Sequence, residues 1–269
     1  MDRVKNYIIE RGLYKKGRLF DLKLQQLFFR NSFDRKLRDY SPLIVYQMGK
    51  VASATIYHSL INSYPGIVLH THTFGSDDWN WQVSEVYKHS MIEKKPLKVI
   101  SLTREPISRN ISAFFQNYRK YTGESFSKSN YSIEELIQLF LDKFDHFEPL
   151  IWFDKHIKSI FDIDVYNSNF PDCGFATYSK NNIQLLVIRS EINDTQKKNA
   201  ICEFLELPNF EIIPKNVGTN RVYATTYRSF VNTIKLSDDY IDEMLNSRYA
   251  TYFYSQEFIE QSKTKWKRY

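Results

Sequence analysis

Lys50 stands in a short loop of small residues that could bind a phosphate group. The stretch LIVYQMGKVASATIYHSL, residues 43–60, runs from an apolar segment through Gly49 into a segment with helical spacing. In a strand–loop–helix unit, the N–H groups of the loop and first helical turn have no intrahelical acceptor and carry the positive end of the helix dipole. Lys50 adds a cation, and Ser53 and Thr55 add hydroxyl donors. The loop therefore predicts an anion site, although a surface lysine at a helix start would leave the same pattern.

A second group of residues suited to a phosphate follows further along the chain. Residues 97–104, LKVISLTR, have the pattern of a strand that ends at Arg104, and Pro106 suits the first turn of a following helix. The Arg104 guanidinium can fork onto phosphate oxygens, and Ser112, about two helical turns on, can donate a hydroxyl to the same group. Both groups would lie at one sheet edge, which predicts a ligand phosphorylated at two ends. The loop at Lys50 lacks the second glycine of GxxxxGK[ST], so ATP or GTP hydrolysis is not expected.

Two histidines end the apolar segment GIVLHTH, residues 66–72. Alternation along a strand places His70 and His72 on one face, and histidine is the first choice for a general base near neutral pH. A hydrogen-bonded structural role is the alternative. No other ligand cluster has recognisable spacing, so we predict no metal site. The remaining histidines lie in helical or polar stretches and are expected to be surface or core residues: His58, His89, His146 and His156.

These side chains need elements that bring them to one place. Four segments have strand character, and three of them are near-continuous apolar runs, as in sheets covered by helices on both faces. They are residues 43–48, 66–72, 97–104 and 183–191. Helical spacing is found over residues 53–64, 132–147, 194–207 and 236–253. The alternation predicts an α/β three-layer sandwich with a mainly parallel central sheet, whose ligands bind outside the carboxyl ends of the strands.

Taken in order, the two phosphate patterns resemble those of sulfotransferases that use 3′-phosphoadenosine 5′-phosphosulfate (PAPS). Lys50-Val51-Ala52-Ser53-Ala54-Thr55 is similar to their 5′-phosphosulfate loop, and Arg104-Glu105-Pro106-x-x-Arg109-x-x-Ser112-x-Phe114 is similar to their 3′-phosphate site. The resemblance covers residues 42–120 and extends more loosely to LLVIRSEI, residues 185–192. Many cytosolic members carry glycine where Ala52 stands, whereas Golgi-type glycan enzymes tolerate alanine. The resemblance implies a P-loop-NTPase-like sulfotransferase fold, and it extends to bacterial sequences described as capsular polysaccharide synthesis proteins.

The resemblance also implies an activity, namely transfer of a sulfuryl group from PAPS to a hydroxyl of an acceptor, with adenosine 3′,5′-bisphosphate (PAP) as product. The acceptor would be a carbohydrate or polysaccharide. Lys50 would stabilise the leaving phosphate, and the N–H groups after Gly49 would cradle the 5′-phosphate. The cradle comprises Val51, Ala52, Ser53, Ala54 and Thr55. Arg104 and Ser112 would hold the 3′-phosphate.

The acceptor side of the site is inferred from the same resemblance. The His-x-His pattern is similar to that of the heparan sulfate 2-O-sulfotransferases, in which the second histidine is the base. This implies His72 as the base and His70 as a substrate-binding residue. Arg109 would orient the acceptor or brace Glu105, and Lys215 lies in a loop that could close over the nucleotide or be plain surface. Reserve candidates for the base are the carboxylates Asp77, Asp78 and Glu85.

Composition narrows the setting of this activity. The 269 residues carry a net charge of +6, which suits an anionic partner, and we expect no nucleic acid among the partners. Two cysteines without paired spacing favour a reducing compartment. There is neither a signal-peptide pattern nor an apolar run long enough for a membrane span, so we expect a cytoplasmic protein. Residues 1–40 form a predicted basic helical arm that packs on a single domain, residues 41–269, or contacts a membrane peripherally. The oligomeric state is left open.

Two other functions fit parts of the sequence. A nucleotide kinase or other phosphotransferase could use the loop at Lys50, but it would require Mg²⁺ ligands, and none of the later strands ends in a clear acidic pattern. A non-catalytic basic module could bind a membrane or an acidic polymer through residues 1–40 and the C-terminal SKTKWKRY.

Overall fold

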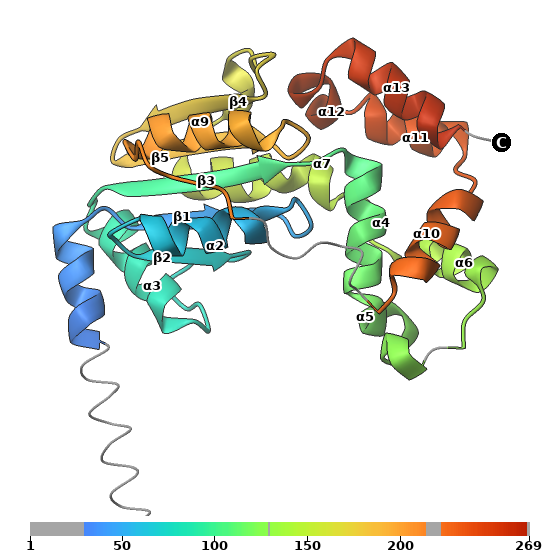
Figure 1. The fold of residues 1–269 in the computed structure, drawn as a ribbon, viewed down its shortest axis with the longest axis horizontal. Helices are drawn as coiled ribbons and strands as arrows, with labels where there is room; N and C mark the ends of the chain where they lie inside the picture. The colour runs from blue at the N-terminus through green and yellow to red at the C-terminus, as the bar shows by residue number, and fades with distance from the viewer. Residues whose placement is uncertain (1–29, 129, 214–221, 268–269) are drawn as a thin grey trace, which may run out of the picture.

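The computed structural model describes residues 30–128, 130–213 and 222–267, and these form a five-stranded sheet with helices packed around it (Figure 1). The strand order is β2-β1-β3-β5-β4. Neighbouring strands run parallel except β4, which pairs antiparallel with β5 at the edge. The strands are β1 (Leu43–Tyr46), β2 (Val68–Thr71), β3 (Leu97–Thr103), β4 (Phe175–Lys180) and β5 (Ile183–Arg189). The predicted α/β architecture with a mainly parallel sheet is therefore confirmed.

Helices cover both faces of this sheet. Figure 1 shows α2 (Ser53–Ser63) and α9 (Asp194–Leu205) on one face, and the segment of α7 (Glu148–Trp152), η3 (Phe153–Lys158) and α8 (Ser159–Phe161) on the other. On that second face the Tyr46 ring of β1 packs against Trp152 and Phe161, with ring centroids 5.3 and 5.9 Å apart. The central strands β1 and β3 are almost fully buried, which is why they are apolar runs rather than alternating ones.

A helical lobe stands beyond the carboxyl ends of β1 and β3. It consists of α4 (Pro106–Gln116), α5 (Tyr118–Thr122), α6 (Ile133–Lys143) and α10 (Ala224–Thr233), with the single turn η2 (Phe126–Lys128). Aromatic rings form its core: Phe114 stacks on Phe230 at 6.0 Å, and Phe140 meets the same ring edge-on at 5.7 Å. Glu105 begins α4 by accepting from the N–H groups of Ile107 and Ser108, both at 2.8 Å. The lobe therefore places α4 as a wall facing the sheet edge.

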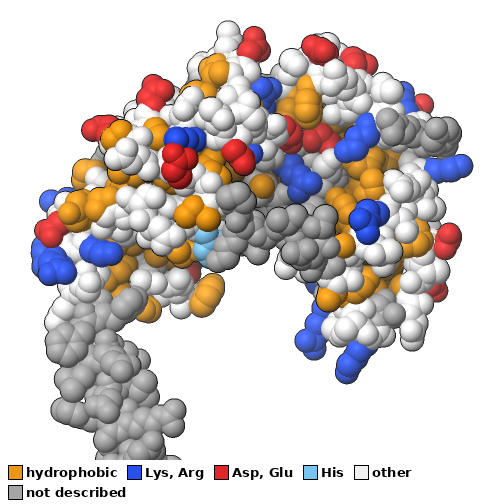
Figure 2. All heavy atoms as spheres, viewed as in Figure 1, with side chains coloured by type: hydrophobic (Ala, Val, Ile, Leu, Met, Phe, Trp, Pro, Cys, Tyr) orange, Lys and Arg blue, Asp and Glu red, His pale blue; other side chains and the backbone are white. Residues whose placement is uncertain are grey.

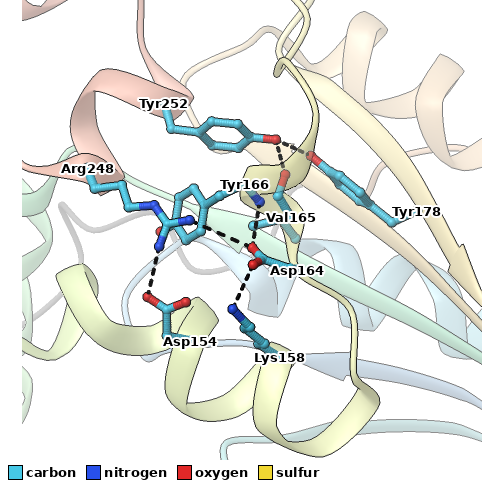
Figure 3. Close-up of polar contacts among 8 residues, drawn as sticks. All are labelled: Asp154, Lys158, Asp164, Val165, Tyr166, Tyr178, Arg248 and Tyr252. Atoms are coloured by element: carbon cyan, nitrogen blue, oxygen red, sulfur yellow. Dashed lines mark hydrogen bonds and ion pairs between the residues drawn. The ribbon is translucent and has the colours of Figure 1, made fainter.

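The C-terminal helices α11 (Asp238–Leu245), α12 (Arg248–Phe253) and α13 (Gln256–Trp266) pack over the start of α4 and the end of β5 (Figure 1). Buried Tyr249 joins them to β3, because its hydroxyl accepts from the backbone N–H of Arg104 at 3.0 Å and donates to the Arg104 carbonyl at 2.9 Å. A polar network on the surface ties α12 to the second face of the sheet (Figure 3). In it Arg248 contacts Asp154 and Asp164, while the Tyr252 hydroxyl donates to the carbonyl of Val165 in η4 (Val165–Asn167).

The boundaries differ from the sequence-based expectation in a few places. The helix predicted over residues 132–147 ends at Lys143, and the one predicted over 236–253 is two helices, because Ser247 caps a new helix by accepting from the Ala250 N–H. Strand β4 escaped prediction because its side chains are mostly half-buried or exposed. Between β2 and β3 lie α3 (Trp81–Tyr87) and η1 (Lys88–Ile92).

The predicted N-terminal arm falls largely outside the described residues. Residues 30–39 are helical and pack on α3, where the Phe33 and Trp81 rings lie 4.9 Å apart and Arg30 is 3.8 Å from Glu85. Within the described parts of the chain, no helix is both long and apolar enough to cross a membrane.

Candidate functional site

The loop between β1 and α2 has an unusual backbone. Lys50 and Ala52 both have positive φ, 76° and 63°, whereas Val51 between them does not. Residues other than glycine rarely adopt positive φ, and those that do cluster at ligand sites. Alternating backbone handedness turns successive N–H groups toward one point and makes a concavity that suits an anion. Ala52 is also the N-cap of α2 and offers no side-chain acceptor, so the first N–H groups of that helix have no capping side chain.

Two arginines hold this loop through its carbonyl groups. Arg104 donates from Nη1 to the Lys50 carbonyl at 2.9 Å, and Arg109 donates from Nε to the Gly49 carbonyl at 3.0 Å. With both carbonyls bonded, the loop conformation is fixed by two charge-assisted contacts. The predicted alternative in which Arg109 braces Glu105 is not what its side chain does, since its other contact is the amide oxygen of Asn110 at 3.2 Å.

Arg109 also brings a buried positive charge to the site. Arg109 is 6% exposed, and this burial lowers the pKa of its guanidinium. Glu148 and Asp145 act on it only through space, and among the described residues it forms no ion pair. A buried cation without a contacting counter-ion is costly, and an anion bound beside it would offset that cost. The charge distribution therefore agrees with the backbone in favouring an anion here.

A pocket of about 490 Å³ opens between the loop and α4. It lies at the carboxyl end of β1, where β2 and β3 lie on opposite sides, the type of position at which α/β sheets bind ligands. Figure 2 shows a histidine side chain reaching the surface on the side of the sheet that faces the helical lobe. The pocket is lined by Gln47, Gly49, Lys50, Ala52, Ser53, Ala54, His70, His72, Arg109, Ala113, Gln116 and Asn117.

His72 is held in a defined orientation, and one hydrogen bond fixes the tautomer of its neutral ring. Its Nδ1 lies 2.7 Å from the backbone carbonyl oxygen of Gln47. A carbonyl can only accept, so Nδ1 carries the proton and Nε2 of the neutral ring is left as the basic nitrogen. A Cβ added at Gly49 would lie 3.9 Å from His72 Cε1, so the ring and the anion loop are in van der Waals reach. A base and a cation-bearing loop therefore share one pocket.

His70 is a support for the loop. Its Nε2 accepts from the Ser53 hydroxyl at 2.8 Å and from the Gln47 side-chain amide at 3.0 Å, and its ring stacks on Tyr57 at 5.3 Å. Burial, followed by the nearby His72 and His58, lowers the pKa of His70 to about 4. His70 is therefore neutral at physiological pH, and its Nε2 is occupied by two donors. The predicted hydroxyl donor Ser53 is turned toward His70.

The far wall of the pocket was missed by the sequence interpretation. Gln116 accepts from Lys50 Nζ at 3.2 Å, and Asn117 lies beside it. With Arg109 and Ala113 they follow the i, i+4, i+7, i+8 pattern of one helix face, which is the signal that could have identified them. Gln47, which contacts both histidines, directly follows β1 and had no motif to mark it.

Several predicted phosphate ligands do not line the pocket. Arg104 faces the opposite side of the loop, near Tyr227 of α10. Burial raises the pKa of Tyr227, and the charge of Arg104 and its hydrogen bond to Tyr227 act in the opposite direction. Ser112 is half-buried on α4 and does not line the pocket. Val51 is fully buried, and Thr55 lies further along α2. Lys215 lies outside the described residues.

The other histidines and the reserve carboxylates have local contacts that account for them. Asp78 accepts from Thr73 and from the Asn80 N–H, and Glu85 pairs with Arg30 and Lys88. His146 contacts Tyr240 at 2.8 Å, and His156 contacts Tyr46 at 2.9 Å. None of these lines the pocket. The described residues contain no group of three or more His, Cys, Asp and Glu side chains that could hold a metal ion.

Comparison with protein families places part of the chain beside known sequences. Residues 126–255 match the family model NKWYS, whose description is "Putative capsular polysaccharide synthesis protein". The match spans just under half of the chain and begins after the loop at Lys50 and after α4. It agrees with the expected likeness to capsular polysaccharide proteins and does not extend to a sulfotransferase family. Searches of curated proteins and of solved structures each found no match.

Proposed function

We propose that this protein is a PAPS-dependent sulfotransferase that acts on a hydroxyl of a carbohydrate. The observation that carries the proposal is that the anion loop, Lys50 and the basic nitrogen of His72 come together in one pocket at the carboxyl end of β1. A donor with a phosphosulfate group needs the loop and the cation. An acceptor hydroxyl needs a neutral base beside them. The fold proposed is accordingly that of the P-loop-NTPase-like sulfotransferases.

The reaction is an in-line displacement. The acceptor oxygen forms a bond to sulfur while the bond from sulfur to the bridging phosphate oxygen breaks, and His72 Nε2 takes the proton of the attacking hydroxyl. Lys50 and the N–H groups of the loop stabilise the charge that develops on the leaving phosphate. Arg109 lies beneath the loop and adds positive charge to the same region. No step of this scheme requires a metal ion.

The assignment of the two ends of the donor follows the geometry. The 5′-phosphosulfate takes the pocket, because that is where Lys50 and His72 meet. The 3′-phosphate takes the other side of the loop, where Arg104 approaches Tyr227 of α10. Arg104 therefore joins the two sites, since the guanidinium that would face the 3′-phosphate also bonds the Lys50 carbonyl. The likeness of residues 126–255 to capsular polysaccharide synthesis proteins supports a saccharide acceptor.

The proposal is tested first by binding. PAP at one hundred times its dissociation constant stabilises a binding protein by about 2.7 kcal/mol, so a thermal-shift titration at millimolar PAP is expected to raise the melting temperature. Lys50→Ala should remove that shift while leaving the melting temperature of the free protein unchanged. Incubation with labelled PAPS and a glycan panel, read by mass spectrometry, then tests transfer. Absence of any shift with PAP, or Mg²⁺-dependent ATP turnover, would overturn the proposal.

A further inference from the structure

A second cavity lies at the carboxyl end of β5, away from the loop at Lys50. It has a volume of about 310 Å³ and is lined by residues that follow β5 and by the first turns of α13. Its polar and aromatic lining includes Arg189, Glu191, Tyr254, Glu257, Phe258 and Gln261. The position is again outside the carboxyl ends of parallel strands, where ligands of α/β sheets bind. The proposed sulfotransferase reaction makes no use of this cavity.

Arg189 reaches this cavity with its charge unneutralised by contact. Its Nη2 donates to the Asp172 carbonyl at 2.8 Å and its Nη1 to the Phe253 carbonyl at 3.4 Å. Within the described residues no carboxylate lies within 4 Å of the guanidinium, and its buried Nε has no hydrogen-bond partner. Arg189 therefore lines the cavity as a cation with only two neutral acceptors for its five N–H donors.

Glu191 faces the same cavity without pairing to Arg189. The residue as a whole reaches the surface, but its carboxylate is tucked against Glu105 and Tyr254. One oxygen accepts from the Glu105 N–H at 2.7 Å, and the Tyr254 hydroxyl lies 3.3 Å from the other. This surrounding raises the pKa of Glu191 through desolvation, which its hydrogen bonds oppose. The carboxylate is thus fixed in place and keeps lone pairs available for a further donor.

The lining defines the chemistry of a ligand. Separate acceptors and donors around a small cavity suit a molecule that carries several hydroxyl groups, because each hydroxyl both donates and accepts. The Phe258 ring, stacked on Tyr254 at 4.7 Å, adds an apolar edge. Glu191 and Glu257 outnumber the single cation Arg189, so the cavity disfavours an anionic ligand. A volume at the low end of the ligand-site range, about 300–1,000 Å³, fits one ring and not a chain.

We propose that this cavity binds one sugar unit that carries no negative charge. Arg189, Glu191 and Tyr254 lie within the segment that matches capsular polysaccharide synthesis proteins, whereas the pocket at Lys50 does not. One hydrogen bond links the lining of this cavity to α4, which forms a wall of the pocket at Lys50. In it Glu191 accepts from the backbone N–H of Glu105, the residue that caps α4. The proposed sugar site at the end of β5 therefore lies next to α4, the helix that carries Arg109. The proposal goes beyond sulfuryl transfer and does not require it.

Ligand-observed NMR by saturation transfer, with the full chain and no nucleotide, tests the proposal. The probes are glucose, galactose and mannose, each compared with its own uronate, so that each pair differs only by the carboxylate at C6. At least one hexose is expected to receive saturation, and its uronate several-fold less. Glu191→Gln keeps an acceptor for the Glu105 N–H and should lower the hexose signal more than twofold. Glu257→Gln removes a negative charge from the lining, so it should reduce the difference in saturation between each hexose and its uronate.

The matched control is Glu260→Gln, which changes a carboxylate on the same helix that does not line the cavity. It should leave every signal unchanged. Circular dichroism and the melting temperature of each variant confirm that it is folded. The proposal is overturned if none of the six sugars receives saturation, if the uronates bind more strongly than the hexoses, or if Glu191→Gln changes no signal. Because PAP is absent, these outcomes are independent of the nucleotide experiments on Lys50.

Discussion

The Nδ1 atom of His72 donates to the backbone carbonyl of Gln47 at 2.7 Å, and this single contact selects the tautomer of the ring. The carbonyl belongs to the residue that follows β1, so the position of the imidazole is set by the sheet and not by a flexible side chain. The neutral ring held in this way has Nε2 as its basic nitrogen. This hydrogen bond links His72, which follows β2, to the loop that follows β1.

Removing this base should separate catalysis from binding. His72→Ala is expected to lower the rate of sulfuryl transfer by about 10²–10⁴-fold, the usual contribution of a general base. The thermal shift produced by PAP should remain, because the carbonyls of Lys50 and Gly49 are held by Arg104 and Arg109 and not by His72. His58→Ala is the control, since His58 does not line the pocket. Equal rates for His72→Ala and the wild type would show that another group takes the proton.

The left-handed backbone at Ala52 predicts that glycine affects the free energy of unfolding differently at Ala52 and at Ala54. Ala52 has φ of 63°, a conformation that costs a residue with a Cβ about 1–2 kcal/mol, so Ala52→Gly should be neutral or should raise the free energy of unfolding. Ala54 lies in the first turn of α2, where Ala54→Gly should lower that free energy by about 0.5–1 kcal/mol. Urea unfolding of both variants measures the difference. Destabilisation by both to the same extent would contradict the strained conformation.

The buried charge of Arg109 predicts a dependence of stability on bound anions. Millimolar pyrophosphate should raise the melting temperature of the wild type, because the anion lies near a cation that lacks a contacting counter-ion. Arg109→Met should lose most of this effect, since both the charge and the bond to the Gly49 carbonyl are removed. Arg228→Met removes an exposed arginine of α10 as the matched control and should respond like the wild type. A pyrophosphate shift of the same size in Arg109→Met would argue against an anion site at this loop.

His70 predicts a loss of stability in acid. Its pKa is about 4 in the folded protein, below the ordinary histidine value of 6.5 expected for the unfolded chain, so protonation favours unfolding. Its contribution is constant above pH 6.5 and is lost as the pH falls from 6.5 toward 4, by about 3 kcal/mol in total. His70→Gln removes this titration, and its free energy of unfolding should fall less between pH 7 and pH 4.5 than that of the wild type. His89→Gln, which removes a histidine of η1 outside the pocket, is the comparison variant; burial lowers the pKa of His89 too, so its profile shows how much such a histidine contributes elsewhere. Parallel pH profiles for wild type and His70→Gln would refute the assignment.

The sequence predicted the parts of the site that depend on strand ends and helix starts. Lys50, His70 and His72 meet because β1 and β2 are parallel neighbours, and parallel pairing follows from the apolar runs of the sequence. The roles within the site were harder to predict. Whether Ser53 faces a ligand or His70, and which side of the loop Arg104 occupies, depend on side-chain rotamers and on contacts with Tyr227 and Tyr249, more than 120 residues away. Local patterns carry no information on such contacts.

The contact between Trp266 and Glu105 has a practical consequence for work with this protein. The indole N–H donates to the carboxylate that caps α4, at 3.3 Å, and Lys265 reaches Ser108 in the same turn. The last turn of the C-terminal helix thus supports the helix that carries Arg109. A truncation that removes Lys265 and Trp266 would remove this support. Expression vectors should therefore retain the chain through Trp266.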